Sequence, residues 1–167
     1  MQKLSKSKSK SHSTKGNARS HGEHRYIEDQ LFDLAFPLLK RVHRIPKQHK
    51  VERHKYFRGY EIDVYITWYS RGWPSFKSMI IELKENDIVK ALDQALKRRR
   101  LALFTYVVIN LKPAYLFRLL IQYHLGILQE AVKKGIGLIS VSGGSPVLLL
   151  RSELNRNWII DNFLKNK

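Results

Sequence analysis

Asp63, Glu82 and Lys84 are the residues whose types and spacing are best suited to chemistry. They belong to residues 60–84, which read as two strands rich in β-branched and aromatic residues, joined by a turn with glycine and proline. If the hairpin is centred on residues 72–73, Asp63 lies directly opposite Glu82, with the two Cβ atoms about 5 Å apart. Lys84 follows Glu82 by two residues and therefore projects from the same side of its strand. The sequence thus predicts two carboxylates and one ammonium group in a single patch of a sheet.

This combination of groups is suited to binding a divalent metal. Two carboxylates within hydrogen-bonding range repel each other, and one takes up a proton unless both share a cation. Such oxygen ligands favour Mg²⁺, with Mn²⁺ as a substitute, and the metal would polarise a phosphodiester and lower the pKa of its bound water. Lys84 would orient or help to deprotonate the attacking water, or stabilise the charge on the phosphorane. The alternative is an ion pair on an exposed sheet, but residues 79–83 are mostly apolar, and buried charges need partners.

The net charge favours a polyanionic partner. The chain has 31 Lys and Arg residues against 14 Asp and Glu, a formal charge of +17. Neutralising phosphates releases counterions and so drives binding to nucleic acid, whereas the alternative is a basic protein that merely stays in solution. Nucleic acid is the predicted partner.

Composition also bounds the organisation of the chain. With 167 residues, 43% of them hydrophobic, it is long enough for one domain with its own core. Residues 1–23 are rich in Ser, Lys and His and are predicted to form a disordered basic tail, followed by a single domain at 24–167. The absence of cysteine excludes disulfides, thiolate catalysis and iron–sulfur clusters. No apolar run is long enough to cross a bilayer, so an intracellular, cytoplasmic protein with no membrane partner is expected.

Hydrophobic periodicity predicts an α/β fold with a mixed central sheet flanked by helices. The predicted helices are residues 24–42, a segment that begins after Asn86 or Asp87, residues 113–135 and a short C-terminal segment. The predicted strands are residues 51–57, 60–69, 77–84, 104–110, 135–142 and 146–152. The 114–134 part of the third helix is apolar nearly all round, which predicts a homodimer interface in addition to its contact with the sheet.

The helix after the hairpin carries a polar strip suited to contact with nucleic acid. Lys90, Gln94 and Arg98 recur at four-residue spacing. Because the helix follows the second strand of the hairpin directly, the strip must begin close to the acidic pair. For the basic residues near the helix C-terminus, interaction with the helix dipole is the alternative role. The predicted nucleic-acid contacts are Lys55, Lys90, Gln94, Lys97 and Arg98.

Asp63 followed by the Glu82-Leu83-Lys84 triplet resembles the motif of the PD-(D/E)xK nuclease superfamily, also called the restriction-endonuclease-like fold. The resemblance covers about residues 25–150, including the order of helices and strands. It implies that Asp63, Glu82 and the backbone carbonyl of Leu83 are ligands of Mg²⁺, and that Lys84 is the catalytic lysine.

Members of this superfamily often add an acid from the first helix and a glutamine from the helix after the E-x-K strand. Glu28 is the best match for the acid, with Asp29 and Asp33 as competitors, and Gln94 matches the glutamine. Ile62 is a departure, because it occupies the position of the proline in the superfamily's name.

The resemblance implies a Mg²⁺-dependent DNA endonuclease whose two copies cut both strands of a duplex. By analogy, branched DNA such as a Holliday junction is the favoured substrate, with sequence-specific cutting and nicking as alternatives. The competing prediction is a non-catalytic DNA- or RNA-binding protein on a degenerate nuclease fold.

Overall fold

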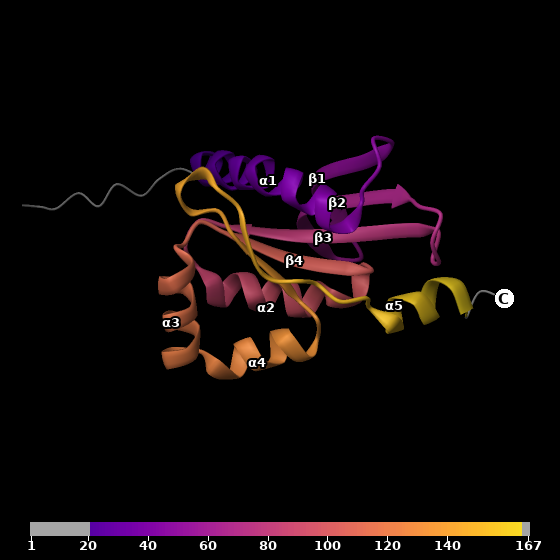
Figure 1. Cartoon of the computed structure of the whole chain (residues 1–167). Helices are drawn as coiled ribbons and strands as arrows, with labels where there is room; N and C mark the ends of the chain where they lie inside the picture. The colour runs from indigo at the N-terminus through magenta and orange to yellow at the C-terminus, as the bar shows by residue number, and fades with distance from the viewer. Residues whose placement is uncertain (1–20, 165–167) are drawn as a thin grey trace, which may run out of the picture.

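Six strands form one mixed sheet, and their order in space is the same as their order in the chain. The computed structural model describes residues 21–164, and Figure 1 shows the sheet between two layers of helices. The strands are β1 (His49–Phe57), β2 (Tyr60–Tyr69), β3 (Phe76–Lys84), β4 (Phe104–Ile109), β5 (Gly137–Ser140) and β6 (Val147–Leu150). β1, β2 and β3 are antiparallel, β3, β4 and β5 are parallel, and β6 is antiparallel to β5. The predicted α/β fold with a mixed central sheet flanked by helices is confirmed.

The helices lie on both faces of the sheet (Figure 1). α1 (His21–His43) covers one face, and α2 (Ile88–Arg98), α3 (Pro113–Tyr123) and α4 (Leu125–Lys133) cover the other. The chain continues after β6 into α5 (Arg156–Ile159) and the π-helical turn η3 (Ile160–Leu164), which pack beside the α1 face. Two 3-10 turns, η1 (Arg99–Leu101) and η2 (Ser142–Gly144), complete the connections. The tail predicted for residues 1–23 lies outside the described residues, apart from residues 21–23, which begin α1.

Two main cores hold these layers together, because successive side chains of each strand point to opposite faces. The core under α1 includes Leu31, Ala35, Leu39, Val64, Ile66, Trp68, Met79, Ile81, Leu83, Tyr106 and Val108. The core under α2, α3 and α4 includes Ile88, Leu92, Ala95, Val107, Ile109, Leu116, Leu120 and Leu138. Strands β4 and β5 contribute to both cores, and β3 adds Ile80 to a smaller third cluster, so all three strands are buried on both faces, as expected of strands with parallel neighbours.

The hairpin has the predicted register. Tyr69 pairs with Phe76, and Val64 pairs with Ile81, which places Asp63 and Glu82 at the next facing positions. The cap predicted after the hairpin is also present, since Asp87 Oδ1 accepts a hydrogen bond from the backbone nitrogen of Lys90 at 3.0 Å. The connection from β3 to α2 is therefore short and anchored.

The prediction of one long helix over residues 113–135 is wrong in one respect, because the segment forms two helices, α3 and α4. Pro113 opens α3 and Gly135, with φ of +65°, follows α4. Between them His124 has φ of −137° and ψ of 33°, which are not helical values, so the two helices meet at an angle. Several apolar side chains of the pair are exposed: Tyr115, Ile121, Tyr123, Leu125 and Val132.

None of the helices within residues 21–164 is long and apolar enough to span a membrane. In contrast to α3 and α4, α1 runs through Pro37 as one helix.

Candidate active site

A cleft opens where β2 and β3 separate. Their backbone pairing ends at Val64 and Ile81, and beyond it the Asp63 carboxylate takes the place of a backbone acceptor. Asp63 Oδ2 accepts a hydrogen bond from the backbone nitrogen of Leu83 at 2.8 Å. The resulting cleft has a volume of about 160 Å³. Its lining residues are Glu28, His54, Glu61, Asp63, Lys84, Lys90, Gln94 and Arg98.

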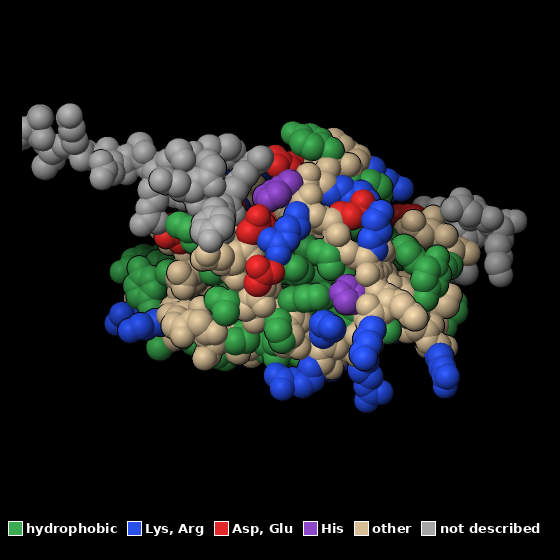
Figure 2. Space-filling model, turned by 90° about the horizontal axis from the view of Figure 1, so that it is seen from above, with side chains coloured by type: hydrophobic (Ala, Val, Ile, Leu, Met, Phe, Trp, Pro, Cys, Tyr) green, Lys and Arg blue, Asp and Glu red, His purple; other side chains and the backbone are tan. Residues whose placement is uncertain are grey.

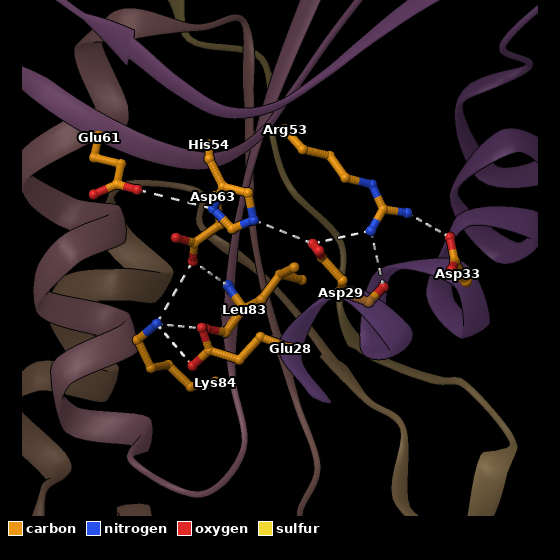
Figure 3. Close-up of polar contacts among 9 residues, drawn as sticks. All are labelled: Glu28, Asp29, Asp33, Arg53, His54, Glu61, Asp63, Leu83 and Lys84. Carbon is orange, nitrogen blue, oxygen red and sulfur yellow. Dashed lines mark hydrogen bonds and ion pairs between the residues drawn. The ribbon is translucent and has the colours of Figure 1, made fainter. Parts of the chain in front are cut away.

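The Lys84 ammonium group lies at the centre of the polar contacts in this cleft (Figure 3). Its Nζ donates to the backbone oxygen of Leu83 at 2.6 Å and to Glu28 Oε1 at 3.1 Å. Asp63 Oδ2 is 3.6 Å from the same nitrogen. All three charged side chains are mostly buried, so these contacts form in a medium where Coulomb interactions are stronger than in water. The ammonium group thus lies among the oxygen atoms of α1, β2 and β3 that were predicted to gather there.

Glu82 is completely buried and faces Arg98 of α2 instead of the Lys84 cluster. Arg98 Nη1 donates to Glu82 Oε2, and only 9% of the Arg98 residue is exposed. The other carboxylate oxygen, Oε1, is buried and has no hydrogen-bond partner. Burial, followed by the negative charge of Asp63, raises the pKa of Glu82 from 4.5 to about 8, although Arg98 and Lys84 act in the opposite direction.

The three acids of α1 that compete for a place in the site lie in different surroundings. Glu28 reaches Lys84, as described above, whereas Asp29 and Asp33 both contact Arg53 of β1. Arg53 Nη1 is 2.9 Å from Asp29 Oδ1, and its Nη2 is 2.6 Å from Asp33 Oδ1. Glu28 is therefore the α1 acid that the fold brings to the Lys84 cluster, while the other two acids attach α1 to the edge of the sheet (Figure 3).

His54 and Glu61 line the cleft, and sequence reasoning did not select either residue. His54 Nε2 is 3.5 Å from Asp29 Oδ1, and its Nδ1 is 3.9 Å from Glu61 Oε1. His54 has φ of +49°, a left-handed conformation that is uncommon for residues other than glycine. The β1–β2 register passes from Arg53–Val64 to Lys55–Ile62, so His54 is at the position facing Asp63. Pairing the predicted strand at 51–57 with the hairpin would have indicated this neighbour.

The five predicted nucleic-acid contacts are divided between two places. Lys90, Gln94 and Arg98 line the cleft, and Gln94 Oε1 is buried there with no hydrogen-bond partner. Lys97 lies outside it and pairs with Asp93 at 2.7 Å. Lys55 is outside it as well, where Nζ donates to Glu52 Oε2 at 2.8 Å and lies 4.5 Å from the centre of the Tyr65 ring.

The cleft has almost no net charge although the chain carries a net charge of +17. Its acids are Glu28, Glu61, Asp63 and the adjoining Glu82, and its cations are Lys84, Lys90 and Arg98. The local charge is −1 with every group ionised, and it is zero when Glu82, whose pKa is raised to about 8, is protonated. On the face seen in Figure 2, acidic, histidine and basic side chains lie close together, whereas other Lys and Arg side chains project from the lower edge of the view. A phosphate group would enter such a cleft more readily together with a cation.

The oxygen atoms of the cleft fit a Mg²⁺ ion, which usually takes one or two carboxylates and completes its shell with water and substrate phosphate. Asp63, Glu82 and the carbonyl of Leu83 offer such a set. Glu82 Oε1 is buried without a hydrogen-bond partner and could therefore act as a metal ligand. The described residues contain no group of three or more His, Asp and Glu side chains arranged as a ready-made metal site. The fit is therefore to a metal that keeps several non-protein ligands.

Comparison of the chain with protein families, with curated proteins and with solved structures finds no match. The geometry of the cleft and the charge of the chain are therefore the features that bear on its function.

Proposed function

We propose that this chain is a Mg²⁺-dependent nuclease with a restriction-endonuclease-like, or PD-(D/E)xK, fold that hydrolyses phosphodiester bonds in DNA. One observation carries the proposal. At the point where β2 and β3 separate, the carboxylates of Glu28 from α1 and Asp63 from β2 both lie within 3.6 Å of the Lys84 ammonium group from β3. A fold needs no such cluster of mostly buried charges for its stability, because apolar groups of similar size serve as well or better.

The proposed metal ligands are Asp63, Glu82 and the backbone carbonyl of Leu83, with Mn²⁺ as a substitute for Mg²⁺. When bound, the ion would supply positive charge to the phosphate and a more acidic water molecule. With Glu82 ionised as a ligand, the two charges of the ion would bring the local charge of the cleft from −1 to +1, which favours entry of a phosphodiester.

Lys84 and Glu28 have complementary roles in this proposal. The Lys84 Nζ is held by Glu28 and by the Leu83 carbonyl, so it is oriented before any substrate arrives. From there Nζ would donate hydrogen bonds to the phosphate oxygens as negative charge builds up on them in the transition state. Glu28 would keep the ammonium group in place and accept a proton from the attacking water or through Lys84.

Lys90 and Gln94 line the mouth of the cleft on α2, and we assign them to contact with the DNA near the scissile phosphate. The exposed apolar side chains of α3 and α4 support a homodimer through residues 114–134, since symmetric cutting of two strands needs two sites. Branched DNA remains the favoured substrate by analogy. An enzyme of this kind would work in the cytoplasm, associated with DNA.

A second candidate function is supported by the contact between Arg98 and Glu82. In this contact the proposed ligand Glu82 already has a cationic partner, so the buried charges compensate one another with no metal. A non-catalytic protein that binds DNA or RNA on a degenerate nuclease fold would have this arrangement. It would bind DNA in a salt-dependent way and would show no turnover.

Cleavage of labelled DNA distinguishes the two candidates. A four-way junction, a linear duplex and a single strand are incubated with Mg²⁺ or EDTA, using the wild type, Glu82→Gln and the control Asp161→Asn. Asp161 is an exposed acid of η3 that lies outside the cleft and outside residues 114–134. We expect Mg²⁺-dependent cutting that Glu82→Gln lowers by roughly 100-fold or more, because losing a direct ligand should cost at least as much as losing an outer-shell partner, which costs about 10- to 100-fold. If no DNA is cut with Mg²⁺ or Mn²⁺ while wild type and both variants bind it equally, the nuclease proposal is refuted.

A further inference from the structure

A second and larger pocket lies at the C-terminal end of α2, and the α2 and η1 residues that line it differ from those that line the candidate active site. Its volume is about 450 Å³, and it is formed by the end of α2 with η1, the end of α4 and the segment between β6 and α5. Figure 1 shows these ends of α2 and α4 near the start of α5. Its charged lining residues are Lys97, Arg99, Arg100, Lys133, Lys134, Arg156 and a single acid, Glu153.

Arg99 builds the inner wall of this basic pocket. Its guanidinium group donates to four backbone carbonyls, those of Ala102 at 3.4 Å, Leu103 at 3.1 Å, Lys134 at 2.8 Å and Glu153 at 2.6 Å. Burial lowers the pKa of Arg99 to about 10, so the group is still charged at neutral pH. Arg99 therefore joins the three segments of the wall and adds fixed positive charge, while its own hydrogen-bond donors are used within the protein.

Other cations of the basic pocket have no partner of their own. Among the described residues, Arg100, Lys133 and Arg156 are exposed and form no side-chain hydrogen bond or ion pair. Arg100 follows the C-terminus of α2 and Lys133 is the last residue of α4, and at such places a cation interacts favourably with the helix dipole. Arg156 is the first residue of α5, where the dipole is unfavourable to a cation, so capping of helices does not explain why the three converge.

We propose that the basic pocket binds the phosphate backbone of DNA at a point away from the cleft. The inference takes DNA as ligand from the proposed function but does not depend on catalysis. Lys90 in the cleft and Arg100 at the pocket are ten residues apart, which is about 15 Å at 1.5 Å per helical residue. At 3.4 Å per base pair, a duplex lying along α2 would reach the pocket about four to five base pairs from the phosphate in the cleft.

Salt dependence of DNA binding tests this proposal without any need for turnover. The pocket variant is Arg100→Ala/Lys133→Ala/Arg156→Ala. The control variant removes the same charge from exposed cations elsewhere and is Arg71→Ala/Lys112→Ala/Arg118→Ala. Affinity for a labelled 20-base-pair duplex is measured in EDTA from 50 to 200 mM salt, and thermal melting checks that both variants are folded.

Affinity decreases with salt, so the slope of log affinity against log salt is negative. We expect its magnitude to be smaller by about 2.7 in the pocket variant, at about 0.9 for each lost phosphate contact, and by less than about 1 in the control. Equal changes in the two variants would mean that only net charge matters and would overturn the proposal. A slope unchanged from wild type in the pocket variant would overturn it too.

A competition with tripolyphosphate identifies the source of the phosphate. If tripolyphosphate binds the wild type but not the pocket variant, and the DNA slope is the same in both, the pocket serves a free polyanion and the DNA assignment is wrong. A loss of Mg²⁺-dependent cleavage is scored separately with Glu82→Gln. A protein that never cuts DNA, but shows the expected change in slope, would refute the proposed catalysis and leave the pocket assignment intact.

Discussion

Replacing Asp63 with Asn or with Ala separates two roles of this side chain. Its carboxylate accepts the Leu83 amide hydrogen at 2.8 Å, and it also contributes negative charge beside Lys84 at 3.6 Å and near Glu82. Asn keeps an oxygen atom for the amide but removes the charge. Ala removes both. If the fold needs the oxygen atom, Asp63→Ala must be less stable than Asp63→Asn. If a metal needs the negative charge, both variants must lose activity to the same extent.

The structure sets the size of the difference. Leu83 is completely buried, so its amide would lose its only acceptor in Asp63→Ala, at a cost of about 1 to 3 kcal/mol. Asp63→Asn avoids this cost. It also removes one of the influences that raise the pKa of Glu82, so that pKa should fall towards its ordinary value. Asp63→Asn is therefore expected to be close to wild type in its free energy of unfolding.

Urea unfolding, DNA binding in EDTA and cleavage with Mg²⁺ measure the three consequences. Both variants should lose cleavage, and both should bind DNA at least as tightly as wild type, because one negative charge leaves the cleft. Cleavage by Asp63→Asn at the wild-type rate would refute the metal-ligand role. Equal stability of the two variants would refute the role of the Leu83 hydrogen bond.

Other predictions concern parts of the fold that surround or support the site. Burial lowers the pKa of His43 from 6.5 to about 4, so the unfolded chain takes up the proton first as the pH falls. Wild type should thus lose about 3 kcal/mol more than His43→Gln between pH 6.5 and 4 in urea unfolding, and parallel pH curves would contradict this. Gly137→Ala places a methyl group 2.2 Å from Tyr106 Cε1 and should lower the free energy of unfolding by about 3 kcal/mol or more, measured by urea titration against Gly126→Ala, where nothing lies within 4 Å. Asp87→Ala removes the cap of α2 and should cost about 1 kcal/mol in the same assay, with no cost meaning that the cap is dispensable.

Local rules were sufficient to predict the elements and the register of the hairpin. Centring the hairpin on residues 72–73 pairs residues 60–69 with the strand at 77–84, and this register places Asp63 opposite Glu82. The start of α3 at Pro113 depends on proline chemistry at the first helical position, which is also local. These features are encoded within a few residues of where they appear.

The contact between Arg98 and Glu82 was beyond such reasoning. Four-residue spacing correctly placed Arg98 on one strip with Lys90 and Gln94, but the direction of that strip depends on how α2 packs against β3. Packing turned Arg98 inward to a buried carboxylate, so its guanidinium group is engaged within the protein. The contact with nucleic acid predicted for it stays a prediction.

Two features needed backbone angles that the sequence does not indicate. The helices α3 and α4 separate at His124, a residue type with no strong tendency to end a helix. His54 enters the cleft because its φ is +49°, and neither glycine nor asparagine is present there to suggest a left-handed residue.

The irregular position of His54 also bears on aggregation. β1 is an outer strand of the sheet, nine residues long, and a regular strand of that length would offer a template for the edge of another molecule. His54 is left out of the pairing with β2, so the strand departs from regular geometry near its middle, and charged residues such as Lys50 and Arg53 lie on it. Straightening the strand, for example with valine at position 54, would create an uninterrupted edge. The unusual conformation that brings an imidazole to the cleft therefore also protects the sheet from growing by one strand from a neighbouring molecule.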